Sequence, residues 1–147
     1  MQAGKKKISD SEDHGLGSVL LTLLFIFALD IELYTTIDFD SSFTVTTLIH
    51  PSTYLNKILI GSNQGTMQLW NIRTSTMVHA FKGFNSPITC FTQTPVVDVI
   101  AVGLLDGSIV IHNIRTDVTI MTLKQEGKVT AVTFRTGRHT AAWNLIS

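Results

Sequence analysis

From residue 44 onward, short apolar stretches alternate with groups of turn residues. The stretches are rich in β-branched residues, and glycine, proline or asparagine stand between them, which is the pattern of consecutive short β-strands. Pro51, Pro87 and Pro95 mark three of the turns, because proline cannot continue a strand ladder. The pattern predicts nine strands, near residues 44–49, 57–61, 66–72, 77–81, 88–92, 98–103, 108–114, 118–123 and 129–134.

This region repeats itself after 42 residues. Residues 61–74 align without gaps on residues 103–116, and six of the fourteen positions are identical. A second pattern, apolar-Thr-x-apolar, begins at positions 45, 88 and 129, which are 43 and 41 residues apart. Two independent series with one period indicate a structural repeat. We therefore expect the two aligned segments to have the same structure.

Each repeat has a hairpin signal between its second and third strands. Gly65 and Gly107 are expected at these turns, because glycine adopts the positive φ that a tight turn needs. Side chains alternate along a strand, so the third strands should each present two faces. One face is expected to carry Met67, Leu69, Ile109 and Ile111, and the other Trp70, Val110 and His112.

Four strands in about 42 residues also describe one blade of a β-propeller. The chain resembles the WD-repeat family, with Trp70-Asn71 and His112-Asn113 where the family has Trp-Asp. The family's Gly-His dipeptide is absent, and only Asp106 and Trp70 match members of its buried side-chain network. The resemblance implies an all-β, partial WD-repeat β-propeller, with about two four-stranded antiparallel blades plus the first strand of a third.

The repeat positions are assigned to structure rather than to chemistry. They are Gly61, Gly65, Trp70, Asn71, Gly103, Asp106, Gly107, His112 and Asn113. Arg73 and Arg115 recur at one offset after the third strand, which makes them candidate phosphate contacts on one rim of the propeller. The alternative is a turn that simply favours a polar residue.

The resemblance divides the chain into five parts. Residues 1–18 form a polar tail, and residues 19–43 an apolar segment with a candidate last strand of a preceding blade. Residues 44–86 and 87–128 form the two blades, and residues 129–147 begin an incomplete third. The apolar run at residues 19–29 is shorter than the roughly 20 residues of a membrane span.

Within the WD-repeat family, residues 50–61 through Trp70-Asn71 and residues 98–103 through Ile114 look most like tandem-propeller subunits of the small-subunit processome. This resemblance covers about residues 30–136 and implies a fragment or truncated product of a longer protein. It also implies a scaffold for ribosomal RNA processing and ribosome biogenesis in the nucleus and nucleolus. Its partners would be other protein subunits of a ribonucleoprotein, with weak RNA contact and no small-molecule substrate.

Composition fits this interpretation and argues against enzymatic chemistry. Of 147 residues, 46 are Thr, Ile or Val, and the net charge is zero, with −4 over residues 1–43 and +4 over residues 44–147. The sequence contains no phosphate-binding loop, nucleophile elbow or zinc-protease motif, and its five histidines and single Cys90 form no local cluster. We expect no catalytic residue, cofactor or metal.

Two other functions stay open on the sequence. A generic WD-repeat adaptor that binds peptides would have the same fold. A secreted or membrane-anchored protein would be led by residues 19–29, although acidic residues precede this run, so membrane association is not favoured. We also expect unpaired blade faces that expose Val96, Val97 and Val99 and make the isolated chain oligomeric or insoluble.

Overall fold

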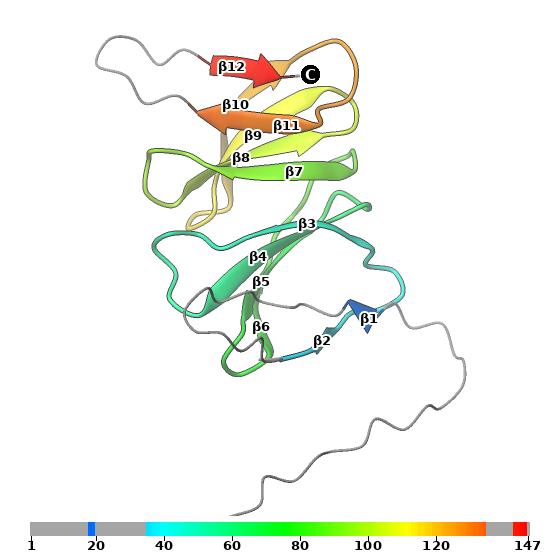
Figure 1. Ribbon diagram of the computed structural model, residues 1–147, viewed down its shortest axis with the longest axis vertical. Coiled ribbons are helices and arrows are strands. Elements are labelled where there is room, and N and C mark those ends of the chain that lie inside the picture. The colour runs from blue at the N-terminus through cyan, green and yellow to red at the C-terminus, as the bar shows by residue number, and fades with distance from the viewer. Residues whose placement is uncertain (1–17, 20–34, 135–142, 147) are drawn as a thin grey trace, which may run out of the picture.

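The computed structural model describes residues 35–134 with their side chains and two further strands by their backbone (Figure 1). The described residues form strands and turns and contain no helix. The strands are β1 (Ser18–Val19), β2 (Ile37–Asp38), β3 (Val45–Ile49), β4 (Lys57–Ser62), β5 (Met67–Asn71), β6 (Thr76–Ala80), β7 (Ile88–Gln93), β8 (Val99–Leu104), β9 (Ser108–Asn113), β10 (Val118–Lys124), β11 (Ala131–Phe134) and β12 (Trp143–Ile146).

Two four-stranded antiparallel sheets make up the centre of the molecule. Strands β3 to β6 pair in sequence order, and strands β7 to β10 do the same, so each sheet is a meander. The first strand of each sheet contacts the first strand of the next, β3 against β7 and β7 against β11. The sheets follow one another along the long axis in Figure 1. The predicted pair of blades is confirmed.

Both ends of the described region add short paired strands. Strand β2 pairs with β1, and it lies 42 residues before the end of β6. Strand β11 pairs with β12 through contacts that run from Ala131↔Ile146 to Phe134↔Trp143. The predicted first strand of a third sheet is present as β11, and β12 pairs with it. The prediction did not include β12, because residues 138–147 contain no glycine, although Gly137 precedes them in the sequence.

Three apolar clusters alternate with the sheets. One fills the space between the two large sheets and includes Leu59, Met67, Leu69, Ile88, Ile100, Val102, Leu104 and Val110. Another lies between β2 and the first sheet and includes Ile37, Phe39, Phe43, Ile58, Ile60 and Ile72. The last joins the second sheet to β11 and includes Val99, Ala101, Ile109, Ile111 and Val129. Strands β4 and β8 are thus buried on both faces, and the expected alternation along β5 and β9 is confirmed.

The expected exposure was wrong for Val99. Val96 and Val97 are 61% and 64% exposed, but Val99 is only 4% exposed. Val96 and Val97 lie in the turn before β8, whereas Val99 begins that strand and packs in the cluster beneath β11. The far face of the second sheet is therefore covered by β11.

Most of the apolar run at residues 19–29 lies outside the described residues. Within the part of the chain that the structure describes, no helix is long and apolar enough to cross a membrane.

Candidate functional site at the junction of the blades

The hairpin turns of both blades are tied to the linkers that follow the blades. Gly65 has φ +82° and Gly107 has φ +87°, and each accepts a hydrogen bond at its carbonyl, from Phe84 N at 2.8 Å and Gln125 N at 3.0 Å. A Cβ at Gly65 would lie 2.7 Å from the Ser86 carbonyl oxygen. Both turns thus need glycine for conformation and for space. The predicted hairpins are confirmed, and one rim of the molecule is built from rigid turns.

Gly61 and Gly103 occupy equivalent places where two sheets come closest. A Cβ at Gly61 would lie 2.9 Å from Cγ2 of Ile88, and one at Gly103 would lie 2.7 Å from Cγ1 of Val129. Ile88 and Val129 both stand at the start of the next repeat. Each blade therefore has a glycine that lets the inner strand of its neighbour approach, as β-sheet glycines often do.

Trp70 and His112, at the signature position, pack against the preceding sheet. The ring of Trp70 meets Phe39 edge-on at 5.5 Å, and His112 meets Phe81 edge-on at 6.0 Å. Phe39 and Phe81 are themselves 42 residues apart. These two partners were not predicted from the sequence, although the 42-residue spacing of the phenylalanines was a signal for them.

His112 also connects to the first blade through Asp117. The Nε2 atom of His112 lies 3.2 Å from Oδ1 of Asp117. The other oxygen of this carboxylate, Oδ2, lies 3.8 Å from Nε2 of His79 and accepts a hydrogen bond from Lys82 N. His112 is 4% exposed. Burial lowers the pKa of His112, and the nearby Asp117 carboxylate opposes that effect only in part. The contact is a polar link across the blade interface.

The asparagines at the signature's second position close turns. Asn71 Oδ1 accepts a hydrogen bond from Arg73 N at 3.0 Å, and Asn113 Oδ1 accepts one from Arg115 N at 2.9 Å. Side-chain bonds of this kind fix the turn without aspartate.

Arg73 and Arg115 therefore stand at equivalent turns of the two blades, and both are exposed. Arg115 is 3.9 Å from Asp98, which accepts a hydrogen bond from Thr53 of the first blade. This rim consequently carries the cationic side chains of Arg73 and Arg115, and Arg115 lies beside a carboxylate.

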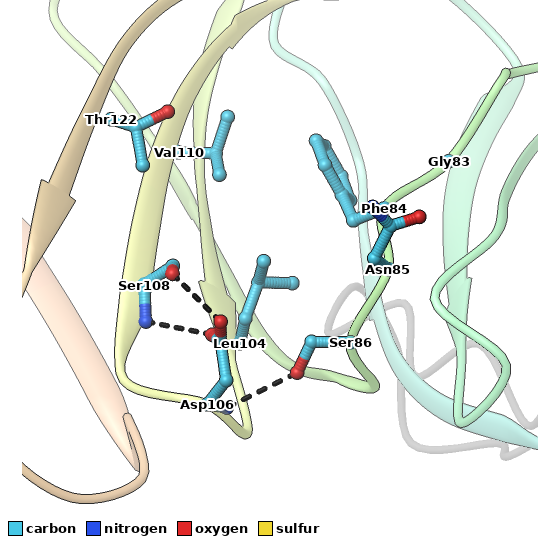
Figure 2. Close-up of a pocket in the computed structure, with 9 residues that line it drawn as sticks. All are labelled: Gly83, Phe84, Asn85, Ser86, Leu104, Asp106, Ser108, Val110 and Thr122. Atoms are coloured by element: carbon cyan, nitrogen blue, oxygen red, sulfur yellow. Dashed lines mark hydrogen bonds between the residues drawn. The ribbon is translucent and has the colours of Figure 1, made fainter.

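A pocket of about 310 Å³ opens at the other rim, between the linker and the second blade (Figure 2). Phe84, Leu104 and Val110 supply its apolar wall. Its polar lining consists of Asn85, Ser86, Asp106, Ser108 and Thr122. Figure 2 shows Phe84 and Val110 facing each other across the opening, with Asp106, Ser86 and Ser108 toward one end.

Asp106 is the charged group of this pocket. Its carboxylate accepts hydrogen bonds from Ser108 N at 2.9 Å, from Ser108 Oγ at 3.0 Å and from Lys124 Nζ at 2.9 Å. These donors, Lys124 first, lower the pKa of Asp106 to about 2, so the carboxylate is ionised at neutral pH. In the WD-repeat network this aspartate would face a histidine, whereas here it faces a lysine.

The described residues contain no group of three His, Cys, Asp or Glu side chains that could hold a metal ion. Cys90 packs beside Gly103, and burial raises the pKa of its thiol. The thiol is thus a weak nucleophile at neutral pH. The described pocket offers apolar walls, hydroxyl groups and a single carboxylate.

Comparison with known proteins agrees with the geometry. The family model of the WDR36/Utp21 first β-propeller matches residues 20–145. Human WD repeat-containing protein 36 is 44% identical over 110 residues, which are 74% of this chain and 12% of that protein. The U3 small nucleolar RNA-associated protein 21 homolog of Schizosaccharomyces pombe is 48% identical over 106 residues, 71% of this chain and 12% of that protein.

Two further similarities extend the comparison. U3 small nucleolar RNA-associated protein 21 of Saccharomyces cerevisiae is 32% identical over 93 residues, which are 63% of this chain and 10% of that protein. A chain in the crystal structure of the Mitotic Checkpoint Complex superposes with a TM-score of 0.58 at 19% identity, over 67% of this chain and 30% of that chain. At this identity the second likeness concerns the fold alone. The chain spans about 12% of the length of its first two relatives.

Proposed function

Because the chain belongs to the WDR36/Utp21 first β-propeller family, we propose that it is part of a non-catalytic scaffold of the small-subunit processome. In this role it presents protein-binding surfaces during ribosomal RNA processing and ribosome biogenesis, in the nucleus and nucleolus. The observation that carries the proposal is the identity of 44–48% to relatives, one of which is named as U3 small nucleolar RNA-associated.

The structure supports a scaffold in a second way. Its two rims are made of short turns held by repeated hydrogen bonds, and the central strands β4 and β8 are buried on both faces. A surface of this kind changes little on binding, which suits the assembly of several partners. Propellers of the WD-repeat type are typically non-catalytic.

The division of the chain follows from the same proposal. Residues 44–86 and 87–128 are two blades. Strand β2 is the last strand of a preceding blade, because it lies one 42-residue period before β6. Residues 129–147 belong to a third blade that contains β11 and β12.

RNA contact in this proposal is weak and electrostatic. Arg73 and Arg115 are exposed at equivalent turns, so two phosphates of a passing strand can be neutralised without base recognition. Because these contacts act through counterion release, the affinity for RNA should be low and should decrease as the salt concentration rises. The main partners are therefore protein subunits of the ribonucleoprotein.

Purification of the tagged full-length protein from nuclear extract tests the proposal. We expect U3 small nucleolar RNA to be enriched at least tenfold over a spliceosomal small nuclear RNA, with processome proteins beside it. The variant with Arg73→Glu and Arg115→Glu should keep most of this enrichment. No enrichment of U3, with recovery of unrelated peptide-bearing proteins instead, would favour the generic adaptor and overturn the proposal.

A further inference from the structure

We propose that the pocket between the first linker and the second blade binds an arginine side chain of a partner protein. This inference rests on the proposed scaffold function, because it names the chemistry by which one rim recognises a partner. The pocket combines apolar walls, an exposed carboxylate and hydroxyl groups in a space of about 310 Å³. That volume is near the lower end for ligand sites, which fits one long side chain better than a whole cofactor.

The walls suit the stem of an arginine. Leu104 and Val110 are each 4% exposed, and the Phe84 ring faces Val110 across the opening. Three methylene groups can lie along this apolar surface while the charged head reaches the rim. A planar guanidinium can also stack on an aromatic face such as that of Phe84, which an ammonium group does less well.

The carboxylate of Asp106 provides the charge. Its side chain is 46% exposed, and its present cation, Lys124, is 60% exposed. An exposed ion pair of this type contributes little to stability, so an incoming cation can take the place of Lys124 at small cost. The exchange keeps the charge balance of the pocket, because one cation replaces another.

Further acceptors surround the same position. Ser86 Oγ accepts a hydrogen bond from Asp106 N at 3.1 Å, and Asn85 and Thr122 add an amide and a hydroxyl oxygen to the lining. Arginine has five N–H donors in a fixed plane and can use several acceptors together. The arrangement therefore favours arginine over lysine.

At the equivalent turn position, the first blade has an amide side chain instead of a carboxylate. Gln64 stands 42 residues before Asp106, and its amide is bonded to Thr44 through Oε1 at 2.9 Å and Nε2 at 3.3 Å. The cleft there, about 490 Å³, is lined largely by aromatic and apolar groups and by Asp38 and Asp40 of the preceding segment. Arginine recognition by the turn residue is thus specific to the second blade.

Nuclear magnetic resonance titration with a capped Gly-Arg-Gly peptide tests the proposal, on this chain joined in cis to the neighbouring blades of its propeller so that the open blade faces are covered. The amide signals of Ser86, Asp106 and Ser108 should shift, and the arginine peptide should bind at least fivefold more tightly than its citrulline analogue. Citrulline has nearly the same shape without the charge. The lysine peptide should fall between them.

Three variants make the test specific. Asp106→Asn keeps an acceptor for Ser108 N and should abolish the preference for arginine over citrulline. Asp98→Asn makes the same change at the opposite end of β8 and should leave affinity within twofold of the original. Lys124→Gln removes the internal competitor and should strengthen arginine binding about two- to fivefold.

Equal affinity for the arginine and citrulline peptides would overturn the inference. So would shifts confined to other residues, or unchanged arginine binding in both Asp106→Asn and Lys124→Gln. The titration contains no processome component. A failed titration would therefore not contradict association with U3 RNA. In the same way, a lack of U3 association would not contradict a measured arginine site.

Discussion

Replacing Gly107 by alanine should weaken the second blade far more than replacing Gly127 by alanine. The two glycines have nearly the same conformation, with φ +87° and +80°. Their surroundings differ. A Cβ on Gly107 would meet the carbonyl oxygens of Gln125 and, at 2.6 Å, of Gly127, whereas a Cβ on Gly127 would meet nothing within 4 Å.

Backbone strain and steric overlap together set the expected loss of stability. A left-handed backbone costs alanine about 1–2 kcal/mol at either site. Forcing a methyl group into a packed space costs about 1–3 kcal/mol more, and backbone atoms can yield little. We expect Gly107→Ala to lower the free energy of unfolding by about 2–5 kcal/mol and Gly127→Ala by about 1–2 kcal/mol.

Urea denaturation followed by circular dichroism measures both values, and thermal denaturation provides a check. At this chain length, 1 kcal/mol corresponds to a Tm change of about 4 °C, so Gly107→Ala should melt about 4–12 °C below Gly127→Ala. Equal destabilisation by the two substitutions would refute the argument, because it would mean that the turn does not press against the linker.

The remaining predictions concern the blade interfaces. The pKa of His112 lies below its ordinary value of 6.5 in the folded protein, so the unfolded chain binds the proton more readily and stability should decrease as pH falls below about 6.5. Urea midpoints at pH 7.5 and 5.5 should reveal this loss, and His112→Phe should reduce it; an unchanged pH slope would contradict the assignment. Gly103→Ala should destabilise by about 1–3 kcal/mol through contact with Cys90 and Val129. In a double-mutant cycle with Val129→Ala, the double variant should lose less stability than the sum of the two single variants. Strict additivity of the two losses would exclude the contact.

The repeat made much of this fold predictable. The 42-residue period and the glycines at Gly65 and Gly107 located all eight strands of the two large sheets to within about two residues. This worked because hairpin chemistry is local. Strand β12 was not predicted because residues 138–147 contain no glycine turn signal, although it pairs with the neighbouring strand β11.

The candidate site was harder to predict from the sequence than the fold. Asp106 was identified through the family network, but its partner Lys124 lies 18 residues away and meets it only because β9 and β10 pair. Val99 was misjudged for a related reason. Its burial depends on β11, which belongs to the next repeat, and a strand pattern alone does not show what covers each face.

The most direct test of the scaffold account is the synthesis of small-subunit ribosomal RNA in cells. Endogenous protein would be depleted and replaced by full-length protein that is wild type, carries Gly65→Val with Gly107→Val, or carries Gly127→Ala as the control. Pulse labelling then measures the ratio of new small-subunit to large-subunit ribosomal RNA, normalised to the amount of protein. We predict a severalfold decrease of this ratio for the double variant and near-normal ratios for the other two. An unchanged ratio for the double variant, or an equal decrease of both RNAs, would contradict the account.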